Sequence, residues 1–160
     1  MSTEAALDDY LAGVETLRHA VAGMTPDQLR ARPIPGKWST LEVVCHLADF
    51  DAIYADRIKR IIASDRPLLV GADHEAYAAR LSYHDRDVDE EIAVVEATRR
   101  QLARTLRGLP AADLDRVGIV RNGQGVDEER TALRHLAIIT GHIPNHLVHV
   151  KEKKKALGFA

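Results

Sequence analysis

Four long stretches of the chain place apolar residues on one face of a helix. Apolar residues recur at three- and four-residue intervals over residues 4–23 and 87–106, which predicts two amphipathic helices. Residues 39–63 open on the capping-box sequence Ser-Thr-Leu-Glu, and their first half is apolar nearly all round. From about Glu128 to Leu157 the apolar residues step 3-4-3-4-3, a typical bundle seam. The pattern therefore predicts an all-α four-helix bundle with residues 39–63 at its centre.

The segments between these helices carry turn and breaker residues. Residues 24–29 predict a short helical turn with proline at its first position, and residues 73–81 predict a second short helix. The apolar residues 68–72 predict a loop that folds back over the core. The glycine-rich segment 117–126 predicts either a small hairpin turning at Asn122-Gly123 or a long loop before the last helix. We expect one domain over residues 1–160 with short extra helices.

Three histidines point to a metal site. His142 and His146 are four residues apart, so on a helix their Cβ atoms lie roughly 5–6 Å apart on one face. His46 lies in the apolar helix, where burial of an uncompensated imidazole is costly. These residues predict a three-histidine metal site between two long helices.

Pro144 separates the two paired histidines, and proline removes a backbone hydrogen bond within a helix. A mild kink would keep His142 and His146 on one face. Alternatively, one helix ends near Gly141 and another begins with Pro144, which would rotate His142 away from His146.

Three neutral imidazoles match the ligand count of catalytic zinc sites, in which water occupies an open position. We expect a divalent metal ion, zinc or nickel first, with iron, manganese, cobalt and copper as alternatives. Such an ion could ionise bound water or hold a low-molecular-weight thiol as thiolate. Two other interpretations stay open: a non-catalytic bundle with a structural or sensory metal, and a helical interaction protein without metal.

Several other polar residues are weaker candidates. Asp49, one turn after His46, could orient a ligand or a water, or be an ion-paired carboxylate. His149 follows the paired histidines and is assigned a role in the pocket or in proton transfer. Cys45 fits a small buried apolar residue better than a nucleophile. The remaining histidines are interpreted as surface or capping residues: His19, His74, His84 and His135.

The composition narrows the class of partner. The net charge is −2, and the one lysine cluster suits a helix C-terminus, so no nucleic acid is expected. Apolar runs fall short of the ~20 residues of a membrane span, and the acidic N-terminus is unlike a signal peptide. A single cysteine excludes an intrachain disulfide. We expect a cytoplasmic protein that acts on a small molecule and contacts no membrane.

Two motifs resemble those of the DinB-like (DinB/YfiT) superfamily of metal-binding four-helix bundles. Residues 37–49 are similar to its tryptophan-serine helix start followed by H-L-x-D, and residues 141–150 to its H-x-x-x-H-x-x-[HQ]-[IV] motif. The resemblance extends over about residues 5–157. It implies metal ligands at His46, His142 and His146, with His149 at the family's following histidine or glutamine. The chain departs from the pattern at Pro144-Asn145, where the family often has another histidine.

The resemblance also implies a class of activity. Family members include bacillithiol-dependent S-transferases, mycothiol-dependent isomerases and hydrolase-like proteins, and they commonly form homodimers. The first hypothesis is thus a metal-dependent enzyme that activates a thiol or water for S-transfer, isomerisation or hydrolysis of a small electrophile. Asp49 and His149 are its candidate catalytic residues.

Overall fold

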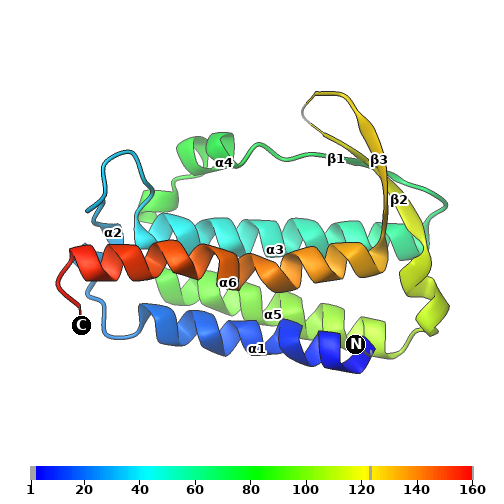
Figure 1. Cartoon of the computed structure of the whole chain (residues 1–160), viewed down its shortest axis with the longest axis horizontal. Coiled ribbons are helices and arrows are strands. Elements are labelled where there is room, and N and C mark those ends of the chain that lie inside the picture. Colours follow the sequence, from blue (N-terminus) through cyan, green and yellow to red (C-terminus); the bar gives the residue numbers. More distant parts are fainter. Residues whose placement is uncertain (1–2, 123, 160) are drawn as a thin grey trace.

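The computed structural model describes residues 3–122 and 124–159, and its main body is a bundle of four long helices (Figure 1). These helices are α1 (Thr3–Val21), α3 (Thr40–Ala63), α5 (Val88–Arg107) and α6 (Ala132–Ala156). Neighbouring pairs are α1 with α6, α6 with α3, α3 with α5, and α5 with α1. The predicted all-α four-helix bundle is confirmed.

The helices begin where their sequences supply a cap. Ser39 Oγ accepts a hydrogen bond from the Glu42 amide, and the Glu42 carboxylate accepts one from the Ser39 amide, which is the predicted capping box. Asp87 caps α5 by accepting from two amides of its first turn. Such caps satisfy amides that have no partner inside the helix, and they fix where each helix starts.

The connections give the bundle a crossover topology. The short helix α2 (Pro26–Arg30) joins α1 to α3 at one end, and α3 and α5 both start at that end (Figure 1). Residues 64–87 must therefore run back along α3. This crossover contains β1 (Leu68–Val70), α4 (His74–Arg80) and one of the 3₁₀ helices, η1 (Tyr83–Asp85). The predicted short helices are confirmed.

A small sheet replaces two segments that were expected to be irregular or helical. β2 (Val117–Arg121) pairs antiparallel with β3 (Asp127–Thr131) and parallel with β1, after the 3₁₀ turn η2 (Ala111–Asp115). The loop predicted at residues 68–72 is wrong in part, because Leu69 buries its side chain on α3 while its backbone pairs with β2. The hairpin alternative is correct and the long loop is wrong; Gly123 of the predicted turn lies outside the described residues.

The last helix starts later than predicted. It begins at Ala132 instead of about Glu128, because residues 127–131 form β3 and Thr131 caps the helix by accepting from the Arg134 amide. The charged residues of this segment lie in β3, which is an edge strand of the sheet.

One arginine connects all four long helices. Arg99 of α5 is fully buried and donates to Asp51 of α3 from Nε at 2.5 Å and from Nη2 at 2.9 Å. It also donates to the carbonyl of Tyr10 on α1 at 2.6 Å and to that of Ile139 on α6 at 3.2 Å. A Cβ on Gly13 would collide with this guanidinium, so a glycine is required there. The charge is thereby neutralised and hydrogen-bonded inside an apolar core.

This contact also fixes which residues of α3 and α6 face each other. The two helices run in opposite directions (Figure 1), so a step toward the N-terminus of α3 matches a step toward the C-terminus of α6. Arg99 sets Asp51 across from Ile139. Five residues farther along, His46 faces position 144, the midpoint between His142 and His146.

None of the helices over residues 3–122 and 124–159 is both long and apolar enough to cross a membrane.

The buried ion pair yields a stability prediction. Asp51→Ala leaves the Arg99 charge buried without a partner and should cost about 3–5 kcal/mol of unfolding free energy. The double variant Asp51→Leu, Arg99→Met removes both charges. Its loss of unfolding free energy should be far smaller than the sum of the losses in the single variants Asp51→Leu and Arg99→Met. Urea unfolding of the single and double variants measures both effects.

The matched control is Asp8→Ala, because Asp8 pairs with Arg107 on the surface with 66% of its side chain exposed. Its loss should cost less than about 1 kcal/mol. Additive effects of the Asp51 and Arg99 substitutions would contradict the account.

Candidate metal centre

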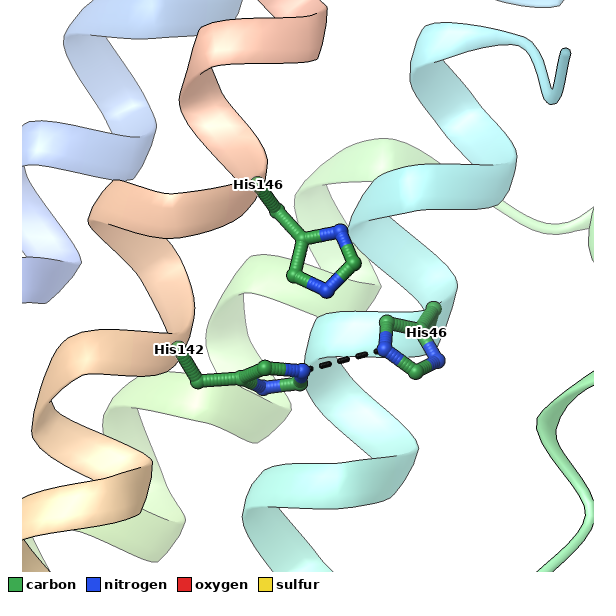
Figure 2. A group of neighbouring side chains, drawn as sticks. All are labelled: His46, His142 and His146. Atoms are coloured by element: carbon green, nitrogen blue, oxygen red, sulfur yellow. Dashed lines mark hydrogen bonds between the residues drawn. The ribbon is translucent and has the colours of Figure 1, made fainter.

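Three histidine side chains from two helices converge at the middle of the bundle (Figure 2). His46 projects from α3, and His142 and His146 project from successive turns of α6. Their ring centroids form a nearly equilateral triangle, with sides of 4.9, 4.7 and 4.7 Å. One ring nitrogen from each lies within 4.8 Å of the other two. The structure thus brings together all three residues predicted as metal ligands.

The helix α6 continues through Pro144, so residues 132–156 form one helix and not two. Pro144 is exposed and lies within α6, and His142 and His146 stay on one face on either side of it. Proline has no amide hydrogen to donate to the Thr140 carbonyl. The helical turn is nevertheless retained, because Ile143 and Leu147 are buried on either side of the proline. The interpretation with two separate helices is therefore wrong.

Burial keeps the three imidazoles neutral. Desolvation is the main cause that lowers the pKa of His46 from 6.5 to about 4, and of His142 from 6.5 to about 3. Desolvation also lowers the pKa of His146. Repulsion between rings adds to this, because His146 lowers the pKa of His46, and His46 and His146 lower the pKa of His142. The neutral form is the one whose nitrogen lone pair binds a metal ion.

The ring nitrogens are poorly satisfied by the protein itself. Nε2 of His46 lies 3.0 Å from Nε2 of His142, so without a proton on one of them two lone pairs face each other. Nδ1 of both residues is buried and has no hydrogen-bond partner among the described residues. The facing Nε2 atoms are the pair that a shared ion would bind, because the ion would accept both lone pairs.

A divalent ion fits this nitrogen set. Two nitrogens bound to one zinc at about 2.0–2.1 Å stand about 3.3 Å apart in a tetrahedral site, close to the 3.0 Å between the two Nε2 atoms. The separations of up to 4.8 Å require the ring nitrogens to draw together by up to about 1.5 Å. Three imidazoles leave at least one position open on such an ion, and their chemistry suits several metals equally.

Aromatic side chains surround the histidines. The rings of Trp38 and Phe50 lie 5.3 and 4.4 Å from that of His46, measured between centroids. His74, expected on the surface, has an exposed side chain, but its ring lies 6.1 Å from both His46 and Trp38. Sequence reasoning missed this proximity, because it depends on where the crossover lays α4 against α3 and no helical spacing encodes it.

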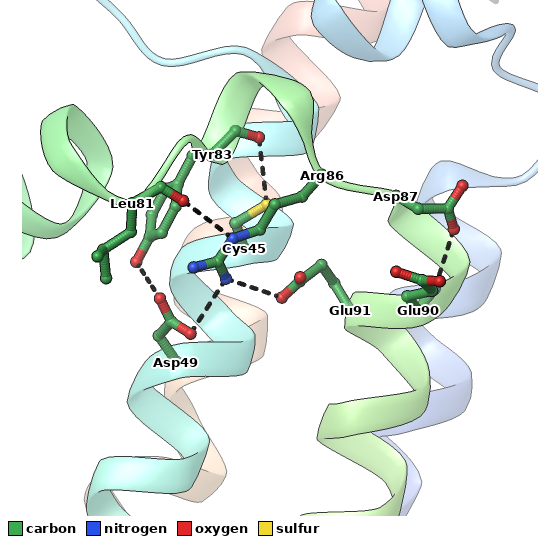
Figure 3. A network of polar contacts seen from close by, with 8 residues as sticks. All are labelled: Cys45, Asp49, Leu81, Tyr83, Arg86, Asp87, Glu90 and Glu91. Carbon is green, nitrogen blue, oxygen red and sulfur yellow. Dashed lines mark hydrogen bonds and ion pairs between the residues drawn. The ribbon is translucent and has the colours of Figure 1, made fainter.

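Asp49, one helical turn after His46 on α3, belongs to an ion-pair network with residues of η1 and α5 (Figure 3). Its carboxylate accepts from Tyr83 Oη at 2.8 Å and from Arg86 Nη1 at 3.2 Å, and Arg86 also pairs with Glu91 at 3.3 Å. This is the ion-paired alternative for Asp49, and it ties η1 to α3. A catalytic role for Asp49 stays a prediction.

Cys45 lies in the same network. It is fully buried, its thiol donates to the Tyr83 carbonyl, and burial raises the pKa of the thiol to about 12. The expected small buried residue is confirmed.

The remaining histidines differ in their surroundings. His149 lies at the edge of the centre, 6.3 Å from the His146 ring, and faces Glu152 at 3.3 Å. Its role in proton transfer stays a prediction. His135 was expected at the surface, but it is fully buried, because it faces Tyr54 while its Nδ1 bonds the Thr131 carbonyl at 3.0 Å. His19 and His84 are exposed, as expected.

The apolar segment at residues 68–70 lines a cavity of about 470 Å³ between α3 and β1. The α3 side of this cavity starts at Ala52, and its lining contains none of the three histidines. This cavity is therefore separate from the three histidines.

Comparisons with known proteins agree with this arrangement. The model of the DinB superfamily matches residues 11–150. A Bacillus licheniformis protein named "Putative metal-dependent hydrolase" is 26% identical over 153 residues, which cover 96% of this chain and 85% of that protein. A Geobacillus thermodenitrificans protein of the same name is 23% identical and covers 91% of this chain and 80% of its own.

Among solved structures, YfiT from Bacillus subtilis matches with a TM-score of 0.89 at 22% identity, over 100% of this chain and 91% of that one. It is described as "a probable metal-dependent hydrolase with an unusual four-helix bundle topology". At this identity the likeness shows the fold.

The depressed histidine pKa values predict how the stability of the metal-free protein depends on pH. The folded protein holds His46 and His142 neutral down to about pH 4 and about pH 3, whereas the unfolded chain takes up protons near pH 6.5. Unfolding free energy should therefore fall as the pH drops from about 6.5 toward 4.

His142→Asn should reduce this slope by up to about 1.4 kcal/mol per pH unit, because one proton-binding group is removed. Urea unfolding in EDTA at pH 7, 6 and 5 measures the slopes, and the exposed His19→Asn should keep the parent slope. Identical slopes in the parent and His142→Asn would show that the ring is not held neutral.

Proposed function

Because the chain belongs to the DinB superfamily, we propose that it is a metal-dependent enzyme whose divalent ion is held by His46, His142 and His146. The open position of the ion takes water or a low-molecular-weight thiol, which attacks a small electrophile. A small-molecule substrate and a homodimeric assembly are part of the same proposal.

One observation carries this proposal. Three desolvated imidazoles from α3 and α6 present a nitrogen each within 4.8 Å of the others, and the Nε2 atoms of His46 and His142 face each other at 3.0 Å. In a purely structural cluster these nitrogens would be expected to face carbonyls or carboxylates and not one another.

The chain's own residues give the proposed site its selectivity. Burial keeps the ligands neutral at physiological pH, so a net positive charge remains on the centre for an anionic nucleophile. Trp38 and Phe50 make one wall apolar, which limits water around the bound molecule. When bound, the ion supplies a hydroxide or thiolate near neutral pH.

The nature of the nucleophile separates hydrolysis from thiol transfer. Water attack at metal sites usually draws on a neighbouring general base, and the closest acid on α3, Asp49, is engaged with Tyr83 and Arg86. A divalent ion would lower the pKa of bound water and of a bound thiol alike, so the engagement of Asp49 does not decide between them. The names of the relatives support hydrolysis, and thiol-dependent transfer or isomerisation is the alternative within the proposal.

A structural or sensory metal is the second candidate. Two apolar clusters pack the bundle, one with Leu7, Leu102 and Leu136, the other with Leu17, Leu47 and Leu147. Each contains residues from α1, α3, α5 and α6, so the helices can pack without an ion. This packing favours the catalytic assignment over the structural one.

Metal content of the untagged protein tests the ligand assignment. We expect about one divalent ion per chain by inductively coupled plasma mass spectrometry, lost in His46→Ala and in His142→Ala. The control His19→Ala changes a histidine with 74% of its side chain exposed and should retain the metal. A parent protein that binds no zinc, nickel or manganese after reloading would refute the enzyme proposal.

Removal of the ion separates the two candidates. The chelated protein should keep its far-ultraviolet circular dichroism and cooperative unfolding, with a lower Tm because bound metal stabilises the folded state by mass action. Loss of helical structure on chelation, reversed by metal, would instead assign a structural role to the ion.

A further inference from the structure

His74 lies beside the histidine centre but belongs to a different part of the fold. It occupies the first turn of α4, in the crossover that lies over α3 on the side away from α1 (Figure 1). Its ring centroid is 6.1 Å from that of His46 and 6.1 Å from that of Trp38. It is not one of the three residues whose nitrogens converge, so it lies outside the ligand set.

The ring of His74 is available to a further molecule. Its side chain is 58% exposed, and its nearest acidic partner, Glu75 Oε1, is 3.8 Å from Nε2, beyond hydrogen-bond distance. The N-terminus of α4 is already capped, because Asp73 Oδ1 accepts hydrogen bonds from the amides of Glu75 and Ala76. The imidazole is therefore not needed as a cap.

The position of α4 is fixed by contacts at its end. Just beyond α4, Tyr83 and Arg86 both bond Asp49 of α3, three residues after His46. The ring of Tyr77 on α4 lies 5.9 Å from Phe50, which packs on His46. These contacts hold the start of α4 next to the centre while leaving the His74 side chain open.

We propose that His74 is a further residue of this centre, which donates a hydrogen bond to the sulfur or oxygen atom of the small molecule held at the open position. The proposal rests on the proposed function, since it requires an ion with an open position. The atom bound to the ion would lie about 2 Å from it, and a hydrogen-bond donor would lie about 3 Å from that atom. The donor is then at most roughly 5 Å from the ion. The His74 ring centroid is 6.1 Å from that of His46, one of the proposed ligands, which is near enough for its side chain to bring a ring nitrogen to this distance.

The Co²⁺-loaded protein tests the contact without a known substrate. Co²⁺ stoichiometry and the sulfur-to-cobalt absorption band are measured while 2-mercaptoethanol is added to the parent and to His74→Phe, which keeps an aromatic ring but loses both nitrogens. We expect one Co²⁺ per chain in both proteins and a Kd for the thiol raised at least roughly tenfold in His74→Phe, as for a lost hydrogen bond to a charged group.

Two further variants complete the design. His74→Gln keeps a donor and should recover part of the affinity, whereas the exposed His19→Phe on α1 should match the parent. Because α4 contains no buried residue, the substitutions at His74 should leave the fold intact, which circular dichroism checks.

The outcomes separate this proposal from the one it rests on. A parent that binds no Co²⁺ overturns the proposed function. A parent that binds Co²⁺ with a thiol Kd within twofold in His74→Phe, or that takes up no thiol, overturns the role of His74 alone. Loss of Co²⁺ from His74→Phe also overturns it, because His74 would then be a metal ligand.

Discussion

The buried contact between Arg99 and Asp51 is the constraint on which the rest of the bundle depends. Arg99 reaches a carboxylate on α3 and carbonyls on α1 and α6, so a single side chain determines the relative register of all four helices. A bundle held only by apolar seams can slide by one turn at modest cost, whereas a buried charge allows one arrangement. That arrangement places His46 between His142 and His146, and the centre follows from it.

The centre has features that are unfavourable in the metal-free protein. The imidazoles are desolvated, the Nε2 atoms of His46 and His142 face each other at 3.0 Å, and their Nδ1 atoms lack partners in the described chain. Buried polar atoms of this kind cost stability, and the two apolar clusters of the bundle supply the stability that the centre does not. The crossover brings α4 to one side of the site, and its contacts with Asp49 hold it there. The helices are therefore packed by one set of residues, and the site is formed by another.

The sequence predicted those parts of the structure that depend on local patterns. The helical spacing of His142 and His146 and the capping box at Ser39 follow from residues within one or two turns. The pairing of β1 with β2 did not follow, because the two strands meet only after about 50 residues, whereas the hairpin of β2 and β3 was one of two alternatives. His135 was misjudged for the same reason, and His74 is exposed as expected while its nearness to His46 was missed, since these surroundings come from segments distant in sequence. Local propensity does not contain such contacts.

The central claim is that three imidazole nitrogens hold one ion that keeps an open position. X-ray absorption at the metal edge of the zinc-loaded protein tests it most directly, because scattering distances report the ligand atoms themselves. The account predicts about three imidazole nitrogens at about 2.0–2.1 Å and at least one further light atom, which added thiol replaces with sulfur at about 2.3 Å. A shell without imidazole, or one closed by four protein ligands and unchanged by thiol, would contradict it.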